Sequence, residues 1–491
     1  MPLSSENYSP RKKLKKPLSL PNIWFKDQSL KHVIFNMHLR SLNDRHHHHH
    51  HLIIPDDDPS PPSPGPTSRF DHTSLLPDSI LLRILSFLPP SQYNPNSLVC
   101  RRWLLLTGRL IRTVRLLDWN FLESGRLIDR FPNVTDVDLV PACIESPYNS
   151  SVHVTHRLIS LHLDADLDED DNARHFIPDK LFLPADSVDD GLRILARGCP
   201  NLRKLVLIAT EAGLASIATD CPNLQELELH RCTDLSLRAI FACQNLQILR
   251  LVGIVDGFYY STVSDIGLTI LAHGCRRLVK LELCGCEGSY DGISAIGKCC
   301  LMLEELTLYD HRMDSGWIAA LSFCHNLKTL RLLGCKRIDP KPGAVEHLGS
   351  CPTLERLHVQ RCHLRDKDSV NALFVVCGAV REIEFQDCWG LDDEMFGIAT
   401  ICRRVKLLSL EGCSLLTADG LESVVLSWKE LQRLRIVSCN NIRDSEVTPA
   451  LSNLLSVLKE FKWRPDSRSV LASSLAGTGM GNKGGRFFNW A

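Results

Sequence analysis

The chain has 491 residues, of which 44% are hydrophobic and 23% charged, a composition that excludes collagen, a coiled coil and wholesale disorder. The 56 Lys and Arg residues balance the 57 Asp and Glu residues, so net charge gives no reason to expect attraction to nucleic acid or membranes. No apolar run approaches the roughly 18 residues of a membrane helix, and the N-terminus lacks the layout of a secretory signal. We therefore expect an intracellular protein with no membrane and no direct nucleic-acid partner.

The first 69 residues differ in composition from the rest of the chain. Arg11–Lys16 is a basic cluster of the kind that nuclear importers bind, which favours the nucleus over the cytoplasm. His46–His51 form a run of histidines that we interpret as low complexity rather than as a metal site. Prolines are frequent over 55–68 and indicate a linker. We predict a disordered segment over 1–69 and folded structure from about Phe70.

Two short helices are expected next. Pro77 suits a first helical turn, and apolar residues recur at helical spacing from Ile80 to Leu88, where Pro89 ends the pattern. A second short helix is expected over 97–107. Helices of this length bury too little apolar surface to be stable alone, so this region is expected to bind a partner.

This stretch resembles an F-box. The family pattern L-P-x-x-[IV]-L-x-x-[IL]-x-S-x-L-P, followed after a short gap by V-C-[KR]-x-W, is matched over residues 76–103. The resemblance implies a domain over 70–116 that binds a Skp-type adaptor and, through it, the cullin and RING subunits of a ubiquitin ligase. The residues that it implies for adaptor binding are Leu76, Pro77, Ile80, Leu81, Ile84, Leu85, Leu88, Pro89, Val99, Cys100 and Trp103.

Cysteines mark a long internal repeat. Nine of them, 22 to 32 residues apart, open the phrase C-x-x-L-x-x-L-x-L, whose last apolar positions alternate as in a short strand. A helical pattern usually follows. The same phrase without the cysteine begins at Phe131, Thr155 and Trp428, which gives twelve candidate repeats. The nine cysteine anchors are Cys199, Cys221, Cys243, Cys275, Cys300, Cys324, Cys351, Cys377 and Cys402.

The repeat predicts an α/β horseshoe or solenoid over 117–440. A unit of about 25 residues cannot bury its own apolar face, so neighbouring units must stack, with a parallel sheet inside the curve and helices outside. The period and the cysteine-bearing phrase resemble the cysteine-containing class of leucine-rich repeats, which implies a protein-binding scaffold without catalysis of its own.

The cysteines are interpreted as core residues rather than metal ligands. No C-x-x-C pair occurs, and small apolar thiols fill tight interior turns well, so we expect no metal and no cofactor. Cys284 is the exception, because it falls on a strand position that is expected at the sheet surface.

Strand residues between the inward leucines project from the concave side of the sheet and are the candidate target-binding positions. A long gap before Cys275 adds the aromatic loop 253–261, which either docks a target or small ligand or packs on the neighbouring repeat. The candidate target-binding residues are Glu228, Arg250, Phe258, Tyr259, Tyr260, Glu282, Arg331, His358 and Glu384.

A second long gap separates Thr155 from Cys199. Its acidic run, 164–171, indicates a solvated loop, and a thirteenth repeat around Leu181–Leu183 is the alternative.

The C-terminal part ends the array. Val447–Phe461 predicts an amphipathic helix within a capping segment, 441–465. The glycine-rich tail, 466–491, is not a phosphate loop, because it lacks the G-K-[ST] ending of that motif. We expect this tail to be flexible.

An F-box directly before leucine-rich repeats is the layout of the F-box/leucine-rich-repeat substrate receptors that are abundant in plants. The resemblance implies a non-catalytic subunit of an SCF-type ubiquitin ligase, whose repeats bind a target protein for ubiquitination and proteasomal degradation. Two alternatives stay open on the same fold: a protein-interaction scaffold that works without the ligase, and a small-molecule or hormone co-receptor. We expect no catalytic residues.

Overall fold

The computed structural model describes residues 72–144, 152–154, 159–161, 181–254, 262–343, 348–469 and 471. All of them except His72 belong to one compact unit that begins at Thr73. Several predicted features lie outside these residues. They are the segment 1–69 with Arg11–Lys16 and His46–His51, the acidic run 164–171, the loop aromatics Phe258, Tyr259 and Tyr260, and the tail from 472.

Short helices open the described chain, and they differ in part from the prediction. The bounds are η1 (His72–Leu75), α2 (Asp78–Ser86), η2 (Pro90–Gln92), α3 (Tyr93–Ser97) and α4 (Arg101–Leu110). Helix α2 follows Pro77, as predicted. The second predicted helix, 97–107, is wrong at its start, because Cys100 caps α4 by accepting a hydrogen bond from the Trp103 backbone. The polar segment before it is helical too, since Pro95 lies in a first turn, where no backbone N–H is needed.

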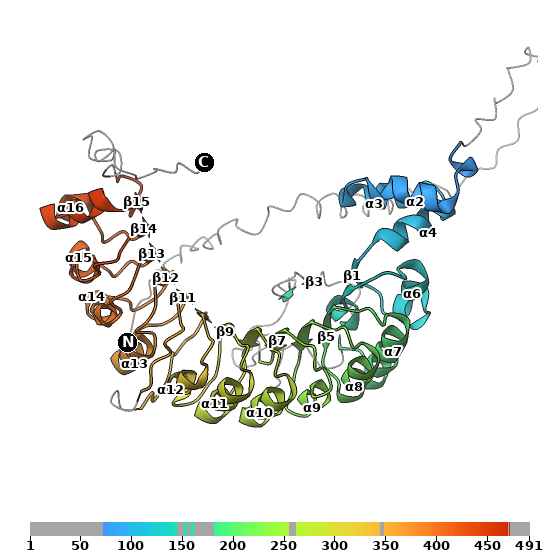
Figure 1. Ribbon diagram of the computed structural model, residues 1–491, viewed down its shortest axis with the longest axis horizontal. Helices are drawn as coiled ribbons and strands as arrows, with labels where there is room; N and C mark the ends of the chain where they lie inside the picture. The colour runs from blue at the N-terminus through green and yellow to red at the C-terminus, as the bar shows by residue number, and fades with distance from the viewer. Residues whose placement is uncertain are drawn as a thin grey trace, which may run out of the picture. The chain divides into compact units, whose positions relative to one another are not determined.

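Thirteen strands of the described chain form one parallel sheet, in which each strand pairs with the next strand of the sheet (Figure 1). The predicted α/β solenoid is therefore confirmed. The strands are β1 (Thr113–Arg115), β2 (Asp136–Asp138), β5 (Lys204–Ile208), β6 (Glu226–His230), β7 (Ile248–Val252), β8 (Lys280–Cys284), β9 (Glu305–Tyr309), β10 (Thr329–Leu333), β11 (Arg356–Gln360), β12 (Glu382–Gln386), β13 (Leu407–Glu411), β14 (Arg433–Val437) and β15 (Glu460–Arg464).

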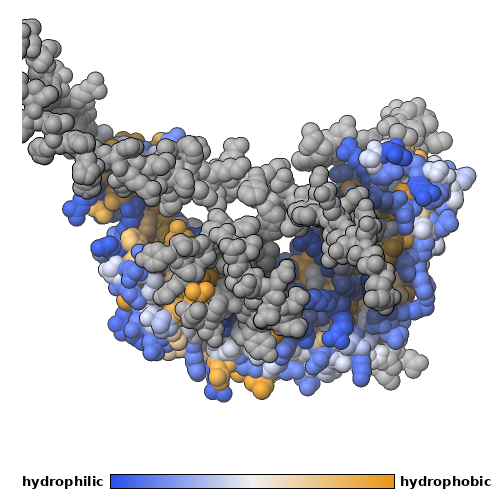
Figure 2. Space-filling model, turned by 180° about the vertical axis from the view of Figure 1, so that it is seen from behind, coloured by the Kyte–Doolittle hydropathy of each residue, from blue (hydrophilic) through white to orange (hydrophobic). Residues whose placement is uncertain are grey.

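Helices cover the outer side of this sheet (Figure 1), and the buried leucines of strands and helices form one continuous core between the two layers. The described α-helices are α5 (Asn120–Glu123), α6 (Arg126–Arg130), α7 (Ala185–Gly198), α8 (Glu211–Asp220), α9 (Leu237–Ile240), α10 (Asp265–Gly274), α11 (Tyr290–Cys299), α12 (Trp317–Ala320), α13 (Lys367–Val376), α14 (Asp393–Gly397), α15 (Ala418–Val425) and α16 (Pro449–Val457). Single 3₁₀ turns are η3 (Val140–Cys143), η5 (Leu321–Phe323), η7 (Ile398–Ile401) and η8 (Asp444–Glu446). On the face shown in Figure 2, the described surface is mostly hydrophilic, with hydrophobic residues in separate spots.

The periodic burial of the cysteines is confirmed. All 20 lie among the described residues, and all are buried except Cys100, which is exposed, and Cys299, which is partly buried. The Cys221 Sγ lies 3.6 Å from the carbonyl oxygen of Cys199, the anchor of the preceding repeat. The same contact recurs further along the array. Cysteine suits this position because its thiol is small, largely apolar and a weak donor.

The prediction that Cys284 lies at an accessible surface is wrong. Its side chain is only 6% exposed, and burial raises the pKa of its thiol to about 12. Val252 and Tyr309 flank it in the sheet register, so it lies between two larger side chains. Because the thiolate is the reactive form, Cys284 is not a reactive surface thiol.

The repeat predicted at Thr155 is not part of the solenoid. Strand β2 pairs directly with β5, while β3 (Val152–Val154) and β4 (Ile159–Leu161) pair antiparallel with each other in a separate sheet. The alternative repeat around Leu181–Leu183 is also wrong, because Phe182 makes only an isolated antiparallel bridge with Ile144. The leucine phrase that begins at Thr155 therefore does not mark a strand of the 13-stranded sheet. Helix α7 and strand β5 already complete the repeat that follows β2.

The sheet instead gains a strand at each end that the phrase does not predict, β1 and β15. The predicted capping helix is shorter than 447–461: α16 ends at Val457, and the next strand pairs with β14. The backbone becomes extended at Leu458, and Trp463 is buried in the core by the period-two alternation of β15.

Candidate functional site

Helix α2 carries two apolar faces. Leu81 and Leu85 are 1% and 0% exposed and pack with Leu106 in a small core. Ile80 and Ile84, at the same spacing one residue earlier, are 44% and 47% exposed. A surface helix of a self-sufficient domain buries its apolar side chains on one face and presents polar residues on the other. The second apolar face of α2 therefore has the character of a partner-binding surface.

The exposed face continues beyond the helix, through residues that the sequence pattern did not single out. Phe87 follows Ile84 by three positions and is exposed, as are Leu75 before the helix and Leu98 after α3. The remaining side of α2 is polar, with Ser79 and Arg83 exposed. A signal for Phe87 was available, because it extends the spacing of the two isoleucines by another turn.

The structure separates the predicted adaptor-binding residues by burial. Leu81 and Leu85 lie in the domain's own core, so their expected effect is on folding rather than on direct contact. Leu76, Leu88 and Trp103 are partly buried. The exposed members are Ile80, Ile84, Pro77, Pro89, Val99 and Cys100.

Arg102 fixes the start of α2 and was missed by sequence reasoning. Its Nε donates to the Asp78 carboxylate at 2.8 Å, and its Nη1 donates to the Thr73 carbonyl at 3.0 Å. It also donates to the Leu76 carbonyl. One guanidinium thereby holds the turn before α2 against α4, and the exposed face of α2 is positioned with it.

The register of the sheet brings the predicted target-binding residues of β6, β7 and β8 side by side. Arg250 lies between Glu228 and Glu282, at 3.4 Å from a carboxylate oxygen of each. His230 Nε2 lies 2.9 Å from Glu228 Oε1. Burial acts to raise the pKa of Glu228, but the His230 hydrogen bond and the Arg250 charge outweigh it and lower the pKa.

The other predicted charges of the concave side are paired as well. Arg331 Nε lies 3.0 Å from Glu305, and His358 Nδ1 lies 3.0 Å from Glu384. The His358 hydrogen bond lowers the pKa of Glu384. These residues therefore make a surface of mixed polarity whose charges already neutralise one another, which suits a protein partner better than a polyanion.

Trp389, which follows β12 in the chain, is an exposed side chain that sequence reasoning missed. It is 61% exposed, yet its ring stacks on His363 with centroids 5.0 Å apart. Its backbone N–H donates to the Cys362 carbonyl at 2.9 Å, and its carbonyl accepts from Leu364 at 2.7 Å. A large aromatic ring held rigidly at a surface is typical of a binding anchor.

Within the described ranges, no cluster of three or more His, Cys, Asp or Glu side chains has the arrangement of a metal site. The same ranges contain no helix that is both long and apolar enough to cross a membrane.

Comparison with known proteins agrees with this arrangement. The family model described as F-box-like matches residues 73–116. The F-box protein MAX2 homolog A of Petunia hybrida is 24% identical over 417 residues, which cover 75% of this chain and 57% of the petunia protein. The putative RNA-binding protein EEED8.10 of Caenorhabditis elegans is 26% identical over 175 residues, covering 34% of this chain and 23% of that protein. The chain thus spans less than two thirds of either relative.

Two solved structures are similar to part of this chain. The mouse RP105/MD-1 complex is 20% identical with a TM-score of 0.39, covering 68% of this chain and 47% of that one. An internalin (inlF) from Listeria monocytogenes is 13% identical with a TM-score of 0.36, covering 63% and 90%.

The strand registers and the leucine-rich core establish the repeat fold directly, and the F-box-like match precedes it in the chain. The chain therefore carries an F-box-like region over residues 73–116, followed by a solenoid of leucine-rich repeats.

Proposed function

We propose that the chain is the substrate-recognition subunit of an SCF-type ubiquitin ligase. Its F-box binds a Skp-type adaptor, and through it the cullin and RING subunits, while its repeats bind a target protein for ubiquitination and proteasomal degradation. The observation that carries the proposal is the second, exposed apolar face of α2, formed by Ile80 and Ile84. The similarity to a petunia F-box protein supports it.

The chain itself acts as a non-catalytic adaptor in this proposal. It works inside the cell, in the nucleus or the cytoplasm, where its ligase partners act. Its contribution is to hold a target and a ubiquitin-transfer machinery on one body, so it needs binding surfaces rather than reactive groups.

The target surface is assigned to the concave side of the sheet and to Trp389. The paired charges of β6 to β8 would have to exchange partners on binding, and therefore contribute to specificity more than to affinity. Trp389 can lose its exposed apolar area to a partner without such an exchange. We expect Trp389→Ala to weaken target binding while leaving adaptor binding unchanged.

The proposal is tested by measuring the affinity of the full chain for a purified Skp-type adaptor. Replacing Ile80 and Ile84 together by Ala should weaken binding by about 2–4 kcal/mol, because each truncates an exposed apolar anchor without opening the buried core. Arg83→Ala, on the polar side of the same helix, should leave the affinity within about 0.5 kcal/mol. Wild-type chain that fails to bind the adaptor, or equal losses in both variants, would refute the proposal.

A further inference from the structure

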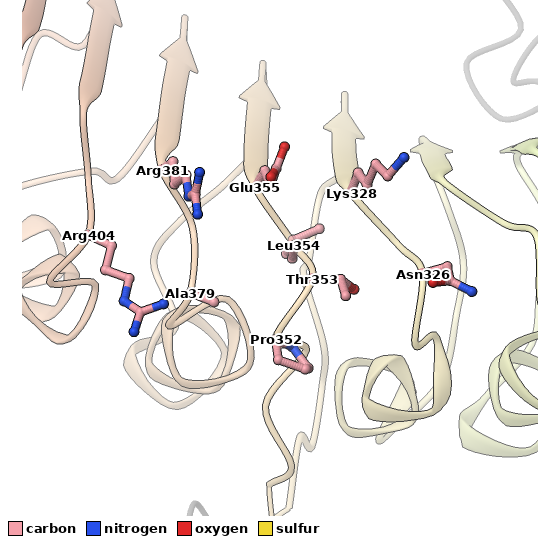
Figure 3. A pocket seen from close by; sticks show the side chains of 9 residues that line it. All are labelled: Asn326, Lys328, Pro352, Thr353, Leu354, Glu355, Ala379, Arg381 and Arg404. Atoms are coloured by element: carbon pink, nitrogen blue, oxygen red, sulfur yellow. The ribbon is translucent and has the colours of Figure 1, made fainter.

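A small pocket opens at the edge of the sheet where β10 to β13 begin. It has about 170 Å³ of open space, and its walls are the turns that lead into these strands. Figure 3 shows Arg404 extending from its own turn towards Ala379, with Arg381 at the start of β12 and Glu355 at the start of β11. The pocket does not involve any residue of the concave ion-pair series described above.

The turn after Cys377 contributes a small side chain, that of Ala379, to the wall of the pocket. Two residues after the repeat anchor, Asn245 and Asn326 each donate through Nδ2 to a carbonyl of the preceding turn, at 2.9 and 2.7 Å. Asn133 makes the corresponding bond at 2.9 Å. The equivalent residue after Cys377 is Ala379, which has no group to donate. Pro352, whose carbonyl would be the corresponding acceptor, also lines the pocket.

The charges around this space do not cancel. Arg381 and Arg404 are exposed, and neither makes an ion pair or side-chain hydrogen bond with any residue in the described part of the chain. Glu355 is likewise without an ion-pair partner there. Lys328 also lines the pocket, but its Nζ lies 2.7 Å from a Glu304 carboxylate oxygen, so this pair is neutral. Two guanidinium groups and one carboxylate leave one uncompensated positive charge.

The charge balance at the pocket differs from that on strands β6 to β8. On β6 to β8, the Arg250 guanidinium lies against the Glu228 and Glu282 carboxylates of the two neighbouring strands. At the pocket, two guanidinium groups from successive repeats lie on one small opening instead. A guanidinium presents two parallel N–H groups to a carboxylate, a geometry that lysine does not offer.

We propose that the pocket formed by Arg381, Arg404 and Ala379 binds the side-chain carboxylate of an Asp or Glu residue in a partner protein. A single net positive charge matches the single negative charge of a carboxylate. A dianionic phosphate would exceed this charge by one and would meet stronger repulsion from Glu355 than a carboxylate does. The inference rests on the proposed function only in taking the partner to be the target of the repeats.

The pocket is a second contact point for a target, at the edge of the sheet. Because both arginines are exposed, the contact is expected to add selectivity for acidic segments and to weaken as salt rises.

The test uses the immobilised full chain and three degenerate pentapeptide libraries, whose central residue is fixed as Glu, Gln or phosphoserine. The proposal predicts that the Glu library is retained about five- to tenfold more than the Gln library at low ionic strength. Arg404→Ala and Arg381→Ala should each remove this preference. Arg403→Ala is the matched control, because Arg403 is an exposed neighbour that does not line the pocket, and it should keep the preference.

A second variant tests whether the opening itself is needed for the preference for Glu, or whether the positive charge of the two arginines is enough. Ala379→Asn restores the side chain found in other repeats and should fill the opening while both arginines remain, so it should also remove the preference for Glu. Thermal unfolding of each variant shows whether it is folded.

Equal retention of the Glu and Gln libraries by the wild-type chain would overturn the inference, as would an equal loss in Arg403→Ala and Arg404→Ala. Preferential retention of the phosphoserine library would overturn the carboxylate assignment. Adaptor binding is measured on the same samples. A chain that binds the adaptor without a Glu preference contradicts this inference alone, whereas a chain that fails to bind the adaptor contradicts the proposed function.

Discussion

Arg102 and Asp78 connect two segments of the F-box that lie 24 residues apart in the chain, with the guanidinium Nε 2.8 Å from the carboxylate oxygen. The same guanidinium also donates to backbone carbonyls in the turn before α2. The ion pair alone contributes little, because both side chains are partly exposed. The bonds to the backbone matter more, since they orient the helix that carries the exposed apolar face.

Arg102→Ala is therefore expected to loosen the start of α2 by about 1–3 kcal/mol and to weaken adaptor binding indirectly. Hydrogen exchange of residues 72–86 should become faster, while exchange in the repeats stays unchanged. Arg101→Ala is the control, because Arg101 is the exposed neighbour on the same turn. Unchanged exchange in Arg102→Ala would show that the turn is held by other contacts.

Thiol reactivity should distinguish the F-box from the repeats. Cys100 is the exposed cysteine, and in the repeats burial raises the pKa values of thiols such as Cys300 to about 12. A disulfide reagent at pH 8 should modify one thiol rapidly, Cys299 more slowly, and the others only after denaturation. Cys100→Ser should remove the rapid phase. Rapid modification of several thiols in the native chain would contradict the burial of the repeat cysteines.

Acid should destabilise the repeat region through His311. Burial lowers the pKa of this side chain to about 4, against the nearby charges of Asp339 and Asp310, and its ring lies 5.3 Å from that of Trp317. Because the folded-state pKa lies below the unfolded value of about 6.5, the unfolded chain binds the proton more tightly. The contribution to stability is complete above about pH 6.5 and is lost as pH falls towards 4.

Between pH 7.5 and pH 4.5, this group alone should remove about 2–3 kcal/mol from the free energy of unfolding. The measurement is urea unfolding at both pH values for the wild-type chain and for His311→Gln, whose side chain does not titrate. The variant should be less stable at pH 7.5 but should lose less on acidification. An identical pH dependence of the two proteins would show that His311 is not the group responsible.

Asp265 stabilises the junction between two repeats. Its carboxylate accepts hydrogen bonds from the Ser289 backbone and hydroxyl, both at 2.7 Å, and from the Gly292 backbone at 2.9 Å, at the start of α11. Asp265→Ala should lower the free energy of unfolding by about 1–3 kcal/mol, because these donors lose a charged acceptor at a helix N-terminus. Asp291→Ala, at an exposed position of the same helix, should cost less than half as much in thermal or urea unfolding.

The sequence predicts the middle of the solenoid well because each anchor cysteine meets the same physical requirement. Its thiol fills a tight turn and contacts the carbonyl of the preceding anchor, so spacing alone locates the strands that follow. The terminal strands, β1 and β15, do not share this requirement for an anchor cysteine. Strand β1 directly follows the F-box helices, and β15 carries Phe461 and Trp463 where other strands carry leucines.

The functional surfaces were predictable only in part, because they depend on contacts between residues that are distant in the chain. The stripe of α2 is visible in the spacing of Ile80 and Ile84, but which of its two apolar faces is buried depends on how α4 packs against it. The clamp by Arg102 is a contact between distant residues. The edge pocket depends on Ala379 standing beside Arg404 of the next repeat, which the sequence of one repeat does not reveal.

The central claim is that the exposed apolar face of α2 is the surface that an adaptor covers. Side-chain footprinting by hydroxyl radicals, with and without a purified Skp-type adaptor, measures this directly at Ile80, Ile84 and Phe87. We predict strong protection of these residues, with no protection of Trp389 or of other exposed side chains of the repeats. An adaptor that binds while these three side chains stay as reactive as before would contradict it.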